Sequence, residues 1–142
     1  MKITDVTVNR YRQMKEVADF AVGSEVLVVD VHTDQGVTGR GFTRAGVSRY
    51  GPVGDLAATL LRRNLKNMVV GQNPLLTEQV WERMYYGYAG VSHLGRQGLV
   101  THCMAAIDFA LWDLKGKALN VPVCDLIGGR REWIPTYANT AH

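Results

Sequence analysis

The sequence has little of three things that would point to specialised classes of protein: cysteine, clustered charge and long apolar runs. Its 142 residues include two cysteines, Cys103 and Cys124, too few for a disulfide framework. No run approaches the roughly 18 apolar residues that a membrane-spanning helix needs. The residues after Lys2 alternate between polar and apolar, which is not the pattern of a signal peptide. These absences predict a cytoplasmic protein without membrane contact.

Charge is modest and dispersed. The formal net charge is +3, and the only adjacent arginine pairs, Arg62–Arg63 and Arg130–Arg131, do not extend into basic runs. This disfavours a nucleic-acid-binding module, which would need a basic footprint. With 46% hydrophobic residues the chain can bury one sizeable core. We therefore expect a globular protein with, at most, a weak preference for anionic small molecules.

The first third of the chain predicts three antiparallel strands. Ile3–Tyr11 alternates loosely, Glu25–Thr33 is rich in β-branched residues, and Val37–Thr43 follows a turn centred on Gly36. Arg12–Ser24 interrupts the alternation and is predicted to be a long loop between the first two strands. A second loop is expected over Thr43–Val53.

The middle of the chain predicts three helices. The first is expected over Asp55–Val70, and the second begins at Asn73–Pro74 as its N-cap and first residue. The third and longest runs from about Leu99 to Leu119, with apolar residues at helical spacing. Ile134–Thr140 predicts one more strand, which is odd at this place because a strand needs a partner.

The third predicted helix carries a family signature. The segment 105–117 (AAIDFALWDLKGK), then Pro122–Val123 and 126–129 (LIGG), resembles the signature of the mandelate racemase and muconate-lactonizing enzymes of the enolase superfamily. The signature usually opens with Ala where this chain has Cys103, and both residues are small. The turn 33–39 (TDQGVTG) and the second predicted helix are also similar to that family, so the resemblance extends from Ile3 to about Asn139.

The resemblance implies an α+β fold: a three-stranded antiparallel sheet with a helical bundle, the N-terminal capping domain of the superfamily. Residues 1–129 would be this domain, with strands in 1–43 and helices in 54–119. Residues 130–142 would be the start of a C-terminal (β/α) barrel, truncated after its first strand. We therefore expect the barrel domain itself as a partner, and the resemblance also implies a homo-oligomer.

The resemblance also implies where the chemistry lies. In the superfamily, barrel residues abstract a proton next to a carboxylate, and Mg²⁺ held at barrel strand ends stabilises the resulting enediolate. No residue of this chain matches those bases or ligands, so we expect no catalytic residue and no metal ligand here. The chain alone is expected to be inactive, and whether it is an enzyme in its own right stays open.

What the resemblance does carry over is substrate recognition, because the loops after the first and third strands fold over the barrel mouth in relatives. The candidates for substrate contact are Met14, Lys15, Phe20, Arg44, Arg49 and Tyr50. Arginine forms bidentate bonds with carboxylates, and aromatic rings exclude water. Asn139 is a further candidate, since it sits near the C-terminal end of the first barrel strand. Each of these could equally be a solvated loop or strand-end residue.

Basic residues in both loops favour a polar, anionic substrate, and we expect an acid-sugar dehydratase. A racemase or epimerase, or a cycloisomerase of the same superfamily, remains an alternative, as does a non-catalytic interaction module. Within the signature, Asp113 and Lys117 lie four residues apart and are interpreted first as a pair on the helix surface. His93 and His102 lack the spacing of a zinc site.

Overall fold

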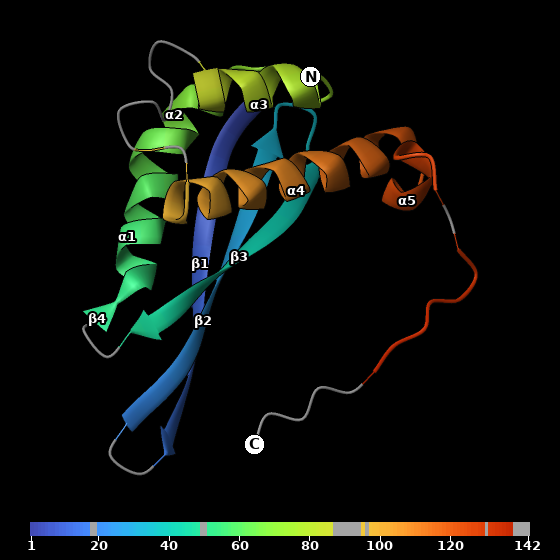
Figure 1. The fold of residues 1–142 in the computed structure, drawn as a ribbon. Coiled ribbons are helices and arrows are strands. Elements are labelled where there is room, and N and C mark those ends of the chain that lie inside the picture. The colour runs from blue at the N-terminus through green and yellow to red at the C-terminus, as the bar shows by residue number, and fades with distance from the viewer. Residues whose placement is uncertain (18–19, 49–50, 87–94, 96, 130, 138–142) are drawn as a thin grey trace.

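The computed structural model describes residues 1–17, 20–48, 51–86, 95, 97–129 and 131–137, with the backbone alone in 13–17, 20–24, 46–48 and 51–52. The fold is α+β, as predicted. An antiparallel sheet in the order β1-β2-β3-β4 is covered on one face by helices (Figure 1). No helix among these residues is long and apolar enough to cross a membrane.

The sheet is built from two long strands and two shorter ones. They are β1 (Ile3–Val17), β2 (Phe20–Thr33), β3 (Thr38–Ser48) and the two-residue β4 (Gly51–Pro52). In β2 every second residue from Glu25 to Thr33 is buried, which is the period of a strand with one face on a core. The β2–β3 turn contains Gly36 at φ +77°, a conformation that glycine adopts without strain.

The prediction of a loop over Arg12–Ser24 is wrong for most of this range, because β1 and β2 both continue into it. Arg12 pairs with Glu25, and the pairing runs on to Val17 opposite Phe20. Two strands can pair wherever their backbone groups bond each other, even when neither face is buried. Alternation of apolar and polar residues marks a strand with one buried face. In this sequence the alternation therefore ends where the core ends, although both strands continue beyond that point.

The second predicted loop, Thr43–Val53, is likewise mostly strand. β3 continues to Ser48, and β4 returns against it, with Val47 opposite Pro52. The helix that follows begins at Val53, two residues before the predicted start.

The predicted first helix is one continuous helical run in three parts. These are α1 (Val53–Thr59), a π-helical stretch η1 (Leu60–Leu65) and α2 (Lys66–Val69). The second helix, α3 (Thr77–Tyr86), starts later than predicted. Asn73 does not cap it: its side-chain Oδ1 accepts the backbone N–H of Leu75, which makes a turn ahead of the helix.

The third helix, α4 (Leu99–Leu119), has the predicted bounds. It ends at Asn120, which adopts the left-handed conformation at φ 53°, and Val121 N donates to the carbonyl of Gly116. This arrangement satisfies carbonyls that the helix end would otherwise leave without donors. A short helix, α5 (Val123–Leu126), follows.

The predicted strand Ile134–Thr140 is not found in its described part. Residues 131–137 leave α5 as an exposed segment without regular structure (Figure 1), and Trp133, Ile134 and Tyr137 are all exposed. A strand forms only where a neighbour accepts its hydrogen bonds. None of the four described strands runs beside this segment.

The core lies between the helix-facing side of the sheet and the helices. Its largest fully buried apolar side chains come from β1, β2, the first helical run, α3 and α4: Ile3, Leu27, Leu61, Leu65, Met84, Met104, Ile107, Leu111 and Leu114. The helix α4 crosses β3 and β2 and supplies the largest share of this core.

Candidate functional site

The β1–β2 hairpin projects beyond the body of the molecule. The helices cover β1 and β2 only over the half that joins the turn before β3, and the other half extends past them (Figure 1). The last buried core residues before the projection are Val8 on β1 and Leu27 on β2. A two-stranded ribbon that extends past the helices depends for its position on what holds its root.

The root of this hairpin is an ion cluster. Arg10 on β1 donates from Nε to Glu25 Oε1 on β2 at 2.7 Å, and its Nη2 lies 2.5 Å from the same oxygen. Its third nitrogen, Nη1, forms an ion pair with Asp55 on α1. Arg12 Nη2 lies 3.9 Å from Glu25 Oε1. The hydrogen bond to Glu25 raises the pKa of Arg10, so the guanidinium keeps its charge.

Glu25 is the unusual member of this cluster, because its side chain is 1% exposed. Its second oxygen, Oε2, has no hydrogen-bond partner among the described residues. The carboxylate lies against the first turn of α1: a Cβ built on Gly54 would stand 1.7 Å from Oε2. Glycine at position 54 is therefore what allows the carboxylate to reach this place.

The structure places four of the seven predicted substrate-contact residues on three strands instead of on loops. Met14 and Lys15 lie in β1 opposite Gly23 and Val22, and Phe20 begins β2 opposite Val17. Arg44 lies in β3 opposite Val26, which in turn faces Tyr11 on β1. Arg44 and Tyr11 are both exposed. Arg49, Tyr50 and Asn139 lie outside the described residues.

The structure thus brings Arg44 into one cross-strand row with Tyr11, and it sets Met14 and Lys15 farther out on the same ribbon. The sequence does not predict the ion cluster at the root of the hairpin. Arg10, Glu25 and Asp55 are separated by 15 and 30 residues, and only tertiary structure joins them.

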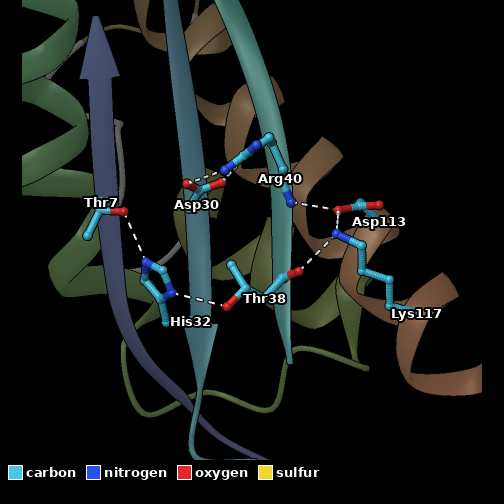
Figure 2. A network of polar contacts seen from close by, with 7 residues as sticks. All are labelled: Thr7, Asp30, His32, Thr38, Arg40, Asp113 and Lys117. Atoms are coloured by element: carbon cyan, nitrogen blue, oxygen red, sulfur yellow. Dashed lines mark hydrogen bonds and ion pairs between the residues drawn. The ribbon is translucent and has the colours of Figure 1, made fainter. Parts of the chain in front are cut away.

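A second polar network joins α4 to the open edge of β3 (Figure 2). Asp113 and Lys117 form the predicted pair, with Lys117 Nζ 2.7 Å from Asp113 Oδ2. Both also bind the β3 backbone: Asp113 Oδ2 accepts the N–H of Arg40 at 2.7 Å, and Lys117 Nζ donates to the Thr38 carbonyl at 3.0 Å. The pair is therefore more than a surface pair, because it occupies backbone groups that an edge strand would otherwise leave unpaired.

Close packing makes this clasp possible. A Cβ on Gly39 would stand 2.0 Å from the Ala110 carbonyl oxygen, and one on Gly41 would stand 2.0 Å from that of Ala106. The two glycines of β3 thus let the α4 backbone lie directly on the strand. In this chain the signature segment of α4 therefore packs against Gly39 and Gly41 of β3.

The sheet face away from the helices carries ordered polar contacts of its own (Figure 2). His32 hydrogen-bonds through its two ring nitrogens with Thr7 Oγ1 at 3.0 Å and Thr38 Oγ1 at 3.1 Å. Arg40 binds both oxygens of Asp30, at 2.7 and 3.0 Å. These bonds from Arg40 lower the pKa of Asp30, so its carboxylate is ionised at neutral pH.

Two ionisable residues on α4 are perturbed in the opposite sense, by burial. Desolvation raises the pKa of the fully buried Cys103 thiol to about 12, which leaves it protonated and a poor nucleophile. Burial, and secondarily the charge of Glu78 on α3, raise the pKa of Asp108. The buried thiol packs in the core, which fits its small-residue place in the signature.

The described part of the chain offers no metal centre. It contains no group of three His, Cys, Asp or Glu side chains that could hold a metal ion. His102 lines a surface hollow at the start of α4 with Gln97, Gly98 and Thr101, and none of these neighbours is an acidic, cysteine or second histidine ligand. His93 lies outside the described residues. These residues do not fit a magnesium site, so we derive no metal-dependent step from them.

The comparison with known proteins decides what kind of domain this is. Residues 2–128 match the family model "Mandelate racemase / muconate lactonizing enzyme, N-terminal domain". The chain belongs to this family. The structural match agrees, since a racemase from Streptomyces coelicolor A3(2) with bound magnesium superposes with a TM-score of 0.76 at 28% identity, over 90% of this chain and 36% of that one.

Two relatives in this family have named activities. A 3,6-anhydro-α-L-galactonate cycloisomerase from Streptomyces coelicolor is 32% identical over 80% of this chain and 30% of the relative. An L-rhamnonate dehydratase from Saccharopolyspora erythraea is 34% identical over 80% of this chain and 27% of the relative. The chain therefore spans less than a third of each of these enzymes, and what it shares with them is the N-terminal domain.

Proposed function

We propose that these residues form the substrate-specificity part of a magnesium-dependent acid-sugar dehydratase. The observation that carries the proposal is the similarity to two enzymes whose names specify acid-sugar substrates, at 32% and 34% identity over 80% of the chain. The projecting hairpin, which carries Lys15, and the exposed Arg44 on β3 are consistent with an anionic substrate. Residues 1–129 would be the capping domain and 130–142 would lead into the barrel.

The reaction that we propose for the whole enzyme is an elimination of water. A base removes the proton on the carbon next to the carboxylate, and the hydroxyl on the neighbouring carbon leaves as water. The resulting enol tautomerises to a 2-keto-3-deoxy acid, so no oxidant or reductant is needed. We assign the base and the Mg²⁺ ligands to barrel residues, as in the superfamily, and to this chain only the binding and enclosure of the substrate. The chain alone would then be inactive.

The proposed contacts follow from charge and place. Lys15 and Arg44 would pair with the substrate carboxylate, because charge-assisted hydrogen bonds to carboxylates are among the stronger polar contacts. Met14, Phe20 and Tyr50 would exclude water from the bound sugar. Arg49 and Asn139 remain candidates for further polar contacts. A homo-oligomer is part of the same proposal.

A cycloisomerase or a racemase is the second candidate, and one observation favours each: the named cycloisomerase among the relatives and the named racemase among the solved structures. Both reactions would begin with the same proton abstraction and would differ from the dehydration only in the fate of the enediolate. A non-catalytic interaction module is favoured by the exposed apolar residues of 131–137, which a barrel domain would cover equally well.

The test is to express the complete reading frame and to offer it a panel of acid sugars with Mg²⁺. We expect at least one acid sugar to form a 2-keto-3-deoxy acid, detected by its semicarbazone, and EDTA to abolish the reaction. Epimerised or isomerised products without loss of water would overturn the dehydratase in favour of the second candidate. No turnover of any acid sugar would overturn both.

A further inference from the structure

The Glu25 carboxylate holds three segments of the chain together, but burying it costs free energy. This cost calls for an explanation other than stability. Removing a carboxylate from water is unfavourable, and a well-packed apolar residue often serves stability equally well. In this chain the carboxylate is 1% exposed, and one of its oxygens finds no hydrogen-bond partner in the part of the chain that the structure describes. Its other oxygen is held by Arg10 at 2.5 and 2.7 Å, and Arg12 Nη2 lies farther from it, at 3.9 Å. In some proteins a buried ion pair of this kind specifies a geometry at a cost in stability.

The cluster lies where two segments join the rest of the molecule: residues 12–24 and residues 43–53, which we propose contact the substrate. Residues 12–24 begin and end next to it, since Arg12 pairs directly with Glu25. Residues 43–53 begin beside it, because Glu25 also pairs with Ala45 on β3. They end beside it as well, because Gly54 meets the Glu25 carboxylate. One carboxylate therefore touches the attachment points of two segments that are far apart in sequence.

We propose that Arg10, Glu25 and Asp55 are positioning residues that fix the β1–β2 hairpin and the β3–α1 connection in one relation to each other. Arg10 links the two strands to α1, because it binds Glu25 on β2 and Asp55 on α1 at the same time. The substrate-related part of this inference rests on the proposed function. The mechanical part, that one cluster orders both segments, does not.

Gly54 completes the arrangement. A side chain at this position would collide with the carboxylate, with Cδ at 2.2 Å and Oε2 at 1.7 Å from the added Cβ. Neighbouring Asp55 supplies the ion pair from the same helical turn. At the end of the β3–α1 connection, Gly54 thus leaves room for the Glu25 carboxylate, and Asp55 supplies the negative charge that pairs with Arg10.

The chain contains a matched control for this cluster. Asp5 on β1 forms an ion pair with Lys66 on α2, which is also a link between β1 and the first helical run. It lies at the opposite end of β1 from the hairpin root. Replacing Asp5 removes a partly exposed strand–helix ion pair, comparable to that of Arg10 with Asp55, without touching either segment.

The test is amide hydrogen–deuterium exchange, followed by mass spectrometry on the 142-residue chain, for Glu25→Gln, Asp55→Asn, Asp5→Asn and the parent. We expect Glu25→Gln to speed exchange about tenfold in peptides covering both 11–24 and 44–54, and Asp55→Asn to do so more weakly. Peptides from α4 should be unchanged, and Asp5→Asn should leave both segments at the parent rate. Asp55→Glu should restore most of the protection lost in Asp55→Asn.

The proposal is overturned if only one segment responds, if Asp5→Asn has the same effect, or if α4 exchanges faster in step with the segments, since that indicates general destabilisation. If Glu25→Gln does not fold, Asp55→Asn decides alone, because it leaves the Arg10–Glu25 pair in place. This result does not depend on the acid-sugar screen. A coupled response without turnover would contradict the proposed function and leave the positioning role standing.

Discussion

Asp108 is a single side chain whose surroundings oppose its charge. It lies half-buried on α4, and burial together with Glu78 on α3 raises its pKa. The folded protein therefore holds this proton more tightly than the unfolded chain does. The unfavourable contribution is absent below the unfolded pKa, near 3.9, grows as the pH rises through the raised folded pKa, and is constant above it.

Replacing Asp108 with Asn should accordingly stabilise the protein at pH 7. We expect Asp108→Asn to raise Tm by a few degrees at pH 7 and to lose this gain as the pH is lowered toward the unfolded pKa. Thermal denaturation followed by circular dichroism between pH 3.5 and 7.5 measures both. Glu82→Gln, which removes an exposed carboxylate of α3, is the control and should show neither effect. A Tm of Asp108→Asn at or below the parent value at pH 7 would mean that the carboxylate has a favourable partner.

The helix α4 packs directly against the backbone of β3. Gly39 and Gly41 admit the helix backbone, and Asp113 with Lys117 clasps the strand edge. Side chains at the two glycine positions would meet backbone carbonyls, which cannot move aside as flexible side chains do. Helix and strand would have to separate along much of the core that α4 builds.

Gly41→Ala should therefore be strongly destabilising. Overpacking of this kind costs about 1–3 kcal/mol and can cost more, and here the obstacle is the Ala106 carbonyl oxygen at 2.0 Å. Urea denaturation of the parent and the variant gives the difference in the free energy of unfolding. Gly129→Ala is the control, because no heavy atom lies within 4 Å of its added Cβ. Equal stability of Gly41→Ala and the parent would show that α4 can be displaced from β3 without loss.

The elements also show what sequence patterns can and cannot predict. The bounds of α4 follow from its long run of apolar residues at helical spacing, since one stripe faces one core. The projecting half of the hairpin leaves no such pattern, because paired backbone needs no buried face. The four-residue spacing of Asp113 and Lys117 predicts their ion pair. Their bonds to β3 give no such signal, because those bonds depend on which strand lies beside the helix. The Arg10–Glu25–Asp55 cluster gives no local signal at all.

Across the whole molecule, recognition and chemistry are proposed to occupy different parts. The fold and family of this chain follow from its sequence with high specificity, because the signature on α4 is long. The identity of the substrate is harder to predict from the sequence. We propose that it depends on a few side chains of the projecting hairpin and the β3–α1 connection, and the apolar pattern that predicts the core does not specify them.

Exchange of the hairpin end tests this division most directly. In the protein expressed from the complete reading frame, residues 13–24 are replaced by the corresponding segment of the L-rhamnonate dehydratase from Saccharopolyspora erythraea, and kcat/KM is measured for the acid-sugar panel. We predict that water elimination persists while the ranking of substrates shifts toward L-rhamnonate. An unchanged ranking, or a uniform loss of kcat on every substrate with the fold intact by circular dichroism, would contradict the assignment of substrate choice to this hairpin.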